Sequence, residues 1–118
     1  MTLQGEYLTS EPDGCASVNF SDLPYAQSIQ HANHMKAHSA TSFAGPLQNA
    51  GYVDIPVSYI ICKNDVSVPP TLQRSVIDMI SKRSGREVTT LRCNSGHFPS
   101  VSVPVELASL IDRVATSS

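Results

Sequence analysis

The sequence predicts an α/β fold, in which a β-α-β-α unit over residues 51–118 follows a helical segment over residues 1–50. Two short runs rich in β-branched and apolar residues predict strands, and the stretch between them has the period of an amphipathic helix. The length of 118 residues fits a single domain spanning 1–118. Because strands and helices alternate, we expect two parallel strands joined by a right-handed crossover.

The composition excludes several classes of protein. Hydrophobic residues make up 41% of the chain and charged residues 15%, which allows a modest core and argues against disorder. The net charge is −2, and no basic run or patch indicates a nucleic-acid partner. No apolar stretch of about 18 residues predicts a membrane span. The start lacks the pattern of a secretory signal, and three widely spaced cysteines favour reduced thiols, so we expect a cytoplasmic protein.

The first part of the chain is polar and rich in Ser, Ala, Gln and His. The stretch 11–14, Glu-Pro-Asp-Gly, is typical of a turn. The stretch Ser-Asp-Leu-Pro at 21–24 predicts the start of a helix from about Pro24 to Ala37, whose thin apolar stripe indicates that it lies on another surface. A second short helix is expected from about Ser39 to the Gly45-Pro46 break.

The second part of the chain has the stronger pattern. An almost continuous apolar run, Val57–Cys62, predicts a strand buried on both faces. Pro69-Pro70 then opens a helix over about Thr71–Ser84, which Gly85 ends. Its apolar side is expected to hold Leu72, Val76, Ile77 and Ile80. The second strand is expected over Glu87–Cys93, and Pro104 opens the last helix.

Two titratable side chains follow the two predicted strands. Asp65 comes shortly after the first strand and His97 shortly after the second. Because the carboxyl ends of parallel strands meet at one edge of a sheet, we expect these side chains to lie close together. A carboxylate that accepts a hydrogen bond from one imidazole nitrogen fixes the tautomer and leaves the other nitrogen as a base.

The stretches "IPVSYIICKNDVSVPPTLQ" and "SGHFPSVSVPVELASLI" resemble the C-terminal half of the α/β-hydrolase fold. More narrowly, they resemble its small esterase-like members, including those of natural-product gene clusters. The resemblance implies that Asp65, in an Asn-Asp-x-x-x-Pro motif, is the acid of a triad and that His97, in a Ser-Gly-His motif, is its histidine. It covers about Phe20–Val114 and implies that residues 1–50 form a lid-like segment.

The sequence departs from this family in one large respect. It contains no Gly-x-Ser-x-Gly nucleophile elbow and no glycine-rich stretch for an oxyanion hole. Loss of a triad nucleophile costs on the order of 10⁶-fold in kcat, so ordinary serine hydrolysis by this chain alone is not expected. We expect a truncated α/β-hydrolase-like fold without the N-terminal half, completed by oligomerisation. The simplest form is a homodimer in which the strands at 57–62 pair antiparallel.

Three functions fit these residues. The first is an enzyme of secondary metabolism in which His97 and Asp65 perform acid/base chemistry on a small hydrophobic molecule: cyclisation, isomerisation, dehydration, or C–C or ester cleavage. The second is half of a split serine hydrolase, completed by a chain that supplies the N-terminal half. The third is a non-catalytic binding module or pseudoenzyme. No cofactor is expected, and the predicted substrate-binding residues are Phe98, Phe43, Tyr25 and His38.

Other candidate nucleophiles and ligands have simpler interpretations. Ser95 and Ser100 flank His97, but such serines usually satisfy loop backbone groups. Cys93 could form a dyad with His97, but a core position at the end of a strand is the preferred interpretation. Three histidines share one helical face at i, i+3 and i+7, yet no carboxylate or cysteine joins them at ligand spacing, so no metal is expected. They are His31, His34 and His38.

Overall fold

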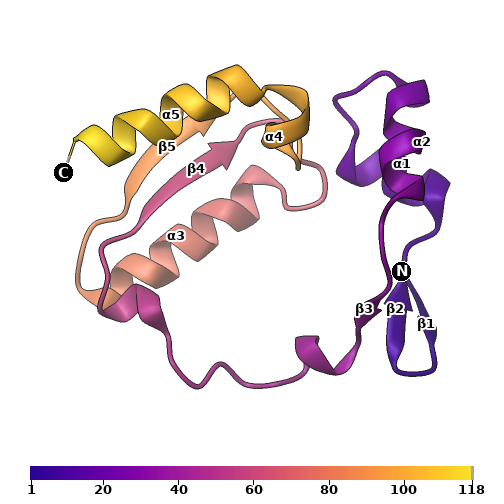
Figure 1. The fold of residues 1–118 in the computed structure, drawn as a ribbon. Coiled ribbons are helices and arrows are strands. Elements are labelled where there is room, and N and C mark those ends of the chain that lie inside the picture. The colour runs from indigo at the N-terminus through magenta and orange to yellow at the C-terminus, as the bar shows by residue number, and fades with distance from the viewer. Residues whose placement is uncertain (118) are drawn as a thin grey trace.

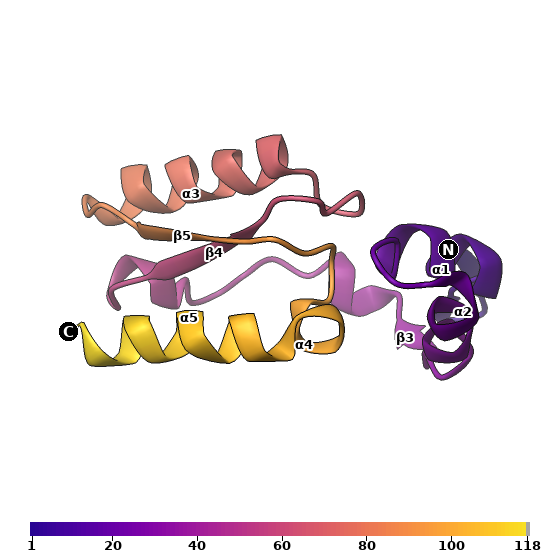
Figure 2. The ribbon, with the colours of Figure 1, turned by 90° about the horizontal axis from the view of Figure 1, so that it is seen from above.

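The computed structural model describes residues 1–117 and consists of two parts (Figure 1). The C-terminal part is a parallel two-stranded sheet of β4 (Ser58–Cys62) and β5 (Thr89–Cys93). Helix α3 (Pro70–Ser84) covers one face of this sheet, and α5 (Pro104–Thr116) covers the other (Figure 2). This arrangement confirms the predicted β-α-β-α unit.

The parallel sheet forms where the β-branched and apolar residues gather. Its register pairs Ser58 with Thr89 and Cys62 with Cys93. The strands are one residue shorter than predicted at the start of β4 and two residues shorter at the start of β5. Both strands end at the predicted cysteine, so the loops that carry Asp65 and His97 begin at the same level.

Helix α3 has the predicted limits but buries a different residue. It has a proline in its first turn and ends at Gly85, whose φ of 69° is the left-handed conformation that favours glycine. The prediction that Leu72 belongs to the buried side was wrong, because Leu72 is 51% exposed and Gln73 is only 2% exposed. The helix turns Gln73 and Ile80 inward, since Gln73 has backbone partners at the end of β4.

The N-terminal part contains more structure than the sequence predicted. A hairpin of β1 (Thr2–Gln4) and β2 (Tyr7–Thr9) pairs with the short strand β3 (His38–Ser39). The predicted turn at 11–14 is instead the start of α1 (Pro12–Asn19), because the Glu11 carboxylate accepts hydrogen bonds from the N–H groups of the first turn.

Helix α2 and the segment after it also differ from the prediction. The helix spans Tyr25–Asn33 rather than continuing to Ala37. The helix expected from Ser39 is a strand, β3, followed by a single 3₁₀ turn over Thr41–Phe43. Pairing with β2 satisfies the backbone of β3, whereas the thin apolar stripe gives a longer helix little packing to stabilise it.

Helices α1 and α2 pack together and then on the loop that contains His97. Their core holds Cys15, Ala16, Phe20 and Ala32. Phe20 stacks on Phe98 with ring centroids 4.9 Å apart, and the Gly96 N–H donates to Asp22 Oδ2 at 2.7 Å. Phe98 precedes the short helix α4 (Pro99–Ser102), whose Val101 also packs against this core. The N-terminal part therefore supports the loop after β5.

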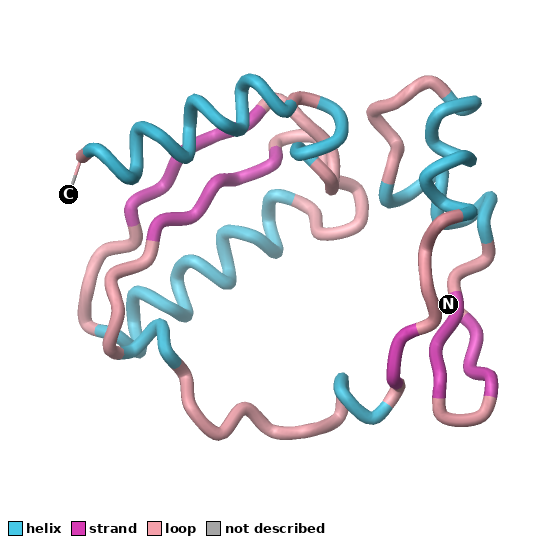
Figure 3. The backbone as a smooth tube through the Cα atoms, viewed as in Figure 1, coloured by secondary structure: helices cyan, strands magenta, loops and turns pink. Residues whose placement is uncertain are grey.

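The chain is more extended than a compact domain of its length. A long segment without strands, including a 3₁₀ turn over Gly51–Val53, connects β3 to β4 (Figure 3). The radius of gyration is 16.2 Å, against about 13.5 Å for a compact domain of this length. The accessible surface is 7958 Å², against roughly 6,200 Å² for a compact monomer of this mass. Much surface is thus left for contacts outside the chain.

The contact between Asp22 and Gly96 yields a stability prediction. A Cβ added at Gly96 would lie 2.8 Å from Asp22 Oδ1, so Gly96→Ala should displace the carboxylate and leave the Gly96 N–H without its acceptor. We expect the free energy of unfolding in urea to fall by about 1–3 kcal/mol. Gly45→Ala is the control, because nothing lies within 4 Å of its added Cβ. An equal effect of both substitutions would contradict the prediction.

Candidate active site

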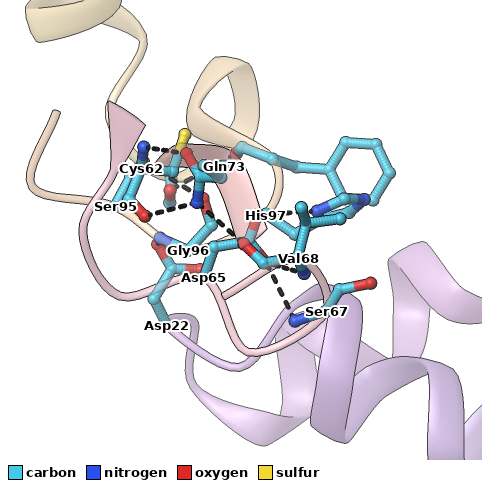
Figure 4. Close-up of polar contacts among 11 residues, drawn as sticks. Asp22, Cys62, Asp65, Ser67, Val68, Gln73, Ser95, Gly96 and His97 are labelled. Atoms are coloured by element: carbon cyan, nitrogen blue, oxygen red, sulfur yellow. Dashed lines mark hydrogen bonds and ion pairs between the residues drawn. The ribbon is translucent and has the colours of Figure 1, made fainter. Parts of the chain in front are cut away.

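Asp65 and His97 meet just beyond the carboxyl ends of β4 and β5 (Figure 4). The His97 Nδ1 lies 2.9 Å from the Asp65 Oδ2. The Asp65 side chain is 5% exposed, whereas the His97 side chain is 29% exposed. The contact that the sequence predicted is therefore present, with the carboxylate inside and the imidazole open to a ligand. The catalytic role of the pair stays a prediction.

The Asp65 carboxylate is held by the turn that follows it. Its Oδ1 accepts the backbone N–H groups of Ser67 and Val68, each at 2.9 Å. Its Oδ2 faces the His97 ring. An ionised carboxylate only accepts hydrogen bonds, so the neutral imidazole donates from Nδ1 and keeps its Nε2 lone pair free. This arrangement leaves Nε2 able to accept a proton.

Hydrogen bonds between the two loops fix the separation of the pair. The Lys63 N–H donates to the Cys93 carbonyl at 3.0 Å, and the Asn64 N–H donates to the Ser95 carbonyl at 2.9 Å. The Asn64 side-chain amide also donates to Asn94 Oδ1 at 3.0 Å. These contacts continue the parallel ladder beyond the last paired residues, so the two loops leave the sheet together.

Gln73 is a site-supporting residue that the sequence reasoning missed. Its Oε1 accepts the Cys62 N–H at 3.0 Å, and its Nε2 donates to the carbonyls of Cys62 at 3.0 Å and Val68 at 2.7 Å. The amide thereby joins the end of β4 to the turn that holds Asp65. The available signal was a polar residue at helical spacing with Ile77 and Ile80, on the buried side of the helix.

Asp22 is a second residue that the sequence reasoning did not assign. The sequence placed it at a helix start, but its carboxylate accepts the Gly96 N–H next to His97. No local sequence signal predicts a partner 74 positions away. The contact connects the N-terminal part to the backbone that orients the imidazole.

Of the four predicted substrate-binding residues, only Phe98 lies beside His97. Its ring packs edge-on to the imidazole, with centroids 4.9 Å apart and an interplanar angle of 80°. Tyr25 is exposed, and its hydroxyl donates to the Asp13 carboxylate, which raises the pKa of the phenol. His38 and Phe43 contact each other at 4.8 Å, around β3, apart from the loop after β5 (Figure 1). The structure does not bring these three to His97.

A hollow lies on the Asp65 side of the site. It has a volume of about 350 Å³ and is formed where α1 and the hairpin approach the turn after Asp65. Its lining residues are Met1, Ser10, Glu11, Gly14, Cys15, Val18, Asn19 and Ser67. Ser67 connects this hollow to the site, because its N–H binds Asp65 Oδ1.

The three histidines of the N-terminal part do not converge. His31 stacks on Phe20, His34 caps the end of α2 with Nδ1 2.7 Å from the Gln30 carbonyl, and His38 lies in β3. Within residues 1–117, no group of three or more His, Cys, Asp or Glu side chains is arranged to hold a metal ion. In the same residues, no helix has both the length and the apolar character that crossing a bilayer requires.

Of the alternative nucleophiles, the cysteines and Ser95 are buried, whereas Ser100 is exposed. Cys15, Cys62 and Cys93 are free thiols inside the structure. Burial raises the pKa of the Cys62 thiol, an effect that a hydrogen bond with Ser95 partly opposes. Ser95 is fully buried and its hydroxyl donates to the Gly96 carbonyl at 3.1 Å. Neither Cys93 nor Ser95 is open to a substrate.

Comparisons with known proteins show that the chain is similar to proteins named as hydrolases. No family model matches the chain. It is 38% identical over 95 residues to "Probable hydrolase R7" of Phoma sp. (strain ATCC 20986 / MF5453), covering 80% of this chain and 39% of that protein. It is 29% identical over 75 residues to "Alpha/beta hydrolase nvfD" of Aspergillus novofumigatus (strain IBT 16806), covering 64% and 28%. The chain thus spans well under half the length of these relatives.

Solved structures give the same result for the fold. Two crystal structures of the pyrethroid hydrolase PytH superpose with TM-scores of 0.53 and 0.54, each at 26% sequence identity. Each match covers 70% of this chain and 32% of the PytH chain. The likeness therefore extends over most of the chain but corresponds to about a third of a PytH molecule.

The protonation of His97 can be measured directly. Because Asp65 Oδ2 accepts from Nδ1, we expect ¹⁵N NMR of the neutral imidazole to show the proton on Nδ1 and none on Nε2. Asp65→Asn should shift the population toward the Nε2-protonated tautomer, whereas Asp54→Asn, at an exposed position, should leave it unchanged. A wild-type ring that carries its proton on Nε2 would contradict this geometry.

Thiol reactivity provides a second test of the site region. Since all three cysteines are buried and the pKa of Cys62 is raised, DTNB at pH 8 should label the folded chain slowly and the urea-unfolded chain at once. Ser100→Cys is the control, because position 100 is exposed and its new thiol should react within the mixing phase. Rapid labelling of the unmodified folded chain would refute the burial described above.

Proposed function

We propose that this chain, which is α/β-hydrolase-like and corresponds to part of its longer relatives, is a hydrolase-related enzyme. In this proposal, His97 and Asp65 perform acid/base chemistry. Its proposed substrate is a small hydrophobic metabolite, in cytoplasmic secondary metabolism. The observation that carries this proposal is the 2.9 Å contact of a partly exposed imidazole with a buried carboxylate. An imidazole oriented by a carboxylate is a common arrangement for a general base.

In this mechanism, His97 Nε2 takes a proton from a carbon next to a substrate carbonyl, or from a hydroxyl group. The electron pair left on the substrate forms an enolate or an alkoxide, and the charge on the imidazolium is balanced by Asp65 at 2.9 Å. The imidazolium then returns its proton. Return to another carbon isomerises the substrate, and return to a departing hydroxyl releases water. Such proton transfer contributes about 10²–10⁴-fold to a rate.

Apolar side chains next to His97 support the proposed substrate class. The Phe98 ring lies edge-on to the imidazole and stacks on Phe20, so one wall of the site is aromatic. We propose Phe98 as the substrate contact within one chain. Tyr25, Phe43 and His38 would take part only if a second copy, in the homodimer that we also propose, brought them to His97.

A second candidate function is supported by the lengths of the relatives. The chain spans 39% and 28% of the two curated relatives, and it contains no Gly-x-Ser-x-Gly motif. A complementing polypeptide that carries the serine elbow would turn His97 and Asp65 into the base and acid of a triad. In that case His97 Nε2 accepts the proton of a serine hydroxyl rather than a proton of the substrate.

The test uses purified chain and a metabolite extract from source cells that lack it, with product formation followed by liquid chromatography and mass spectrometry. We expect His97→Ala and Asp65→Asn to lower the rate by about 10²–10⁴-fold, because one removes the base and the other removes tautomer control. His34→Ala is the control, since His34 lies at the end of α2 outside the site. Circular dichroism verifies folding of each variant.

Three outcomes would contradict the first candidate function. Turnover that survives His97→Ala in a folded protein would remove the imidazole from the mechanism. Labelling by a fluorophosphonate probe only after addition of a serine-bearing partner would instead favour the split hydrolase. Binding of an extract component without turnover, unaffected by His97→Ala, would favour a non-catalytic binding module.

A further inference from the structure

The outer edge of β4 has a defined set of free backbone groups. In a parallel pair, alternate residues direct their N–H and C=O groups to the partner strand. The Val57 carbonyl accepts from Thr89, and the Lys63 N–H donates to Cys93, so odd-numbered residues of β4 face β5. Ser58, Ile60 and Cys62 therefore direct theirs to the other side. Within residues 1–117, no third strand joins this sheet.

The Gln73 amide ends this open edge at Cys62. Its Oε1 and Nε2 bind the N–H and C=O of Cys62 as a neighbouring strand would, each at 3.0 Å. What remains open to a partner strand is the N–H and C=O of Ser58 and of Ile60. Helix α3 thus limits the edge to one short stretch, Ser58–Ile60.

Within Ser58–Ile60, the remaining edge lacks the side chains that keep an edge strand from pairing. Charged residues, proline or a bulge usually protect such edges, and the sequence of β4, SYIIC, has none of them. The other strand of the sheet, β5, carries Arg92. Beside the open edge lies a groove of about 260 Å³ whose apolar lining includes Ile60 and Ile111, and Ile111 is 53% exposed.

The surface of the chain is large enough to include an interface. Its 7958 Å² of accessible surface exceeds that of a compact monomer by about 1,700 Å². A standard interface takes about 800 Å² from each partner. Burial of the open edge and its groove against a partner would remove part of this surface from water.

We propose that the Ser58–Ile60 edge binds the same edge of a second copy in antiparallel orientation, with the two-fold axis at Tyr59. The inference rests on the homodimer proposed above and specifies its interface. In this register Ser58 faces Ile60 of the second copy, and Ile60 faces Ser58 of the second copy. All the open N–H and C=O groups are then paired across the axis.

Neighbouring symmetric registers leave some of the backbone N–H and C=O groups of this edge without a hydrogen bond. An axis at Ser58 would set Ile60 against Pro56, which has no N–H for the Ile60 carbonyl. An axis at Ile60 would set Ser58 against Cys62, whose groups Gln73 already occupies. The register with its axis at Tyr59 is therefore the one in which each open N–H and C=O group has a hydrogen-bond partner.

The same symmetry also buries the groove. A two-fold axis perpendicular to the sheet keeps the α5 face of one copy beside the α5 face of the other. The grooves that contain Ile60 and Ile111 then adjoin, and their exposed apolar surface is covered. The resulting four-stranded sheet has β5 at both outer edges, where Arg92 discourages further addition.

The first arm of the test measures mass in solution by sedimentation and by light scattering at about 50 µM. We expect a dimer for the unmodified chain and at least a 100-fold weaker association for Ser58→Pro. This substitution removes the Ser58 N–H, a hydrogen-bond donor that β4 does not use within its own sheet. Thr90→Pro is the matched control, because Thr90 lies on the outer side of β5, where its N–H also has no strand partner. It should remain dimeric.

The second arm tests the register by disulfide trapping under mild oxidation. Tyr59→Cys should form a covalent dimer, because the two new thiols would face each other across the axis in a non-hydrogen-bonded pair. Val57→Cys is the control: its thiols would be roughly 13 Å apart in this register. Both positions are half-buried in the single chain, and the native cysteines are buried.

Each other outcome overturns the proposal. A monomeric unmodified chain, including one that binds only a different polypeptide at this edge, would rule out the second copy. A dimer that is insensitive to Ser58→Pro would locate the interface elsewhere, and trapping at Val57→Cys but not at Tyr59→Cys would refute the register. No arm uses catalysis, so failure here is distinct from failure of the His97 chemistry.

Discussion

The hydrogen bonds of the Asp65 carboxylate are the constraint on which the candidate site depends. One oxygen binds the two N–H groups of its own turn, and the other binds the His97 ring. Because the carboxylate is buried, it would be costly there without these donors. The loop after β4, the loop after β5 and the imidazole are consequently held by a single charged group. Gln73 extends this support to α3 through the Val68 carbonyl.

The N-terminal part supports the same site from the other side. Helices α1 and α2 do not cover the sheet; they pack on the Phe98 region and bind Gly96 through Asp22. The orientation of the imidazole thus depends on residues far apart in the chain. The lid-like role of residues 1–50 stays a prediction, and within residues 1–117 no third strand joins β4 along its outer edge.

The sequence predicted the order of strands and helices in the C-terminal part because the signals for these elements are local. A continuous β-branched run, paired prolines and Gly85 define β4 and α3, and parallel strands bring Asp65 and His97 together. The failures had physical causes. The Glu11 cap resembles a turn, since the same residue types begin helices and turns. The inward turn of Gln73 and the pairing of β3 depend on partners distant in sequence, which local periodicity does not reveal.

The position of Gln73 has a consequence for how such chains diversify. Its amide substitutes for one rung of a β-ladder, so a residue on a helix decides how many rungs of the adjacent strand are available. A change at this single helical position would free Cys62 and alter the preferred pairing without any change in the strand itself. The same change would release the Val68 carbonyl in the turn that holds Asp65, so the pairing of β4 and the support of the site are linked through one side chain.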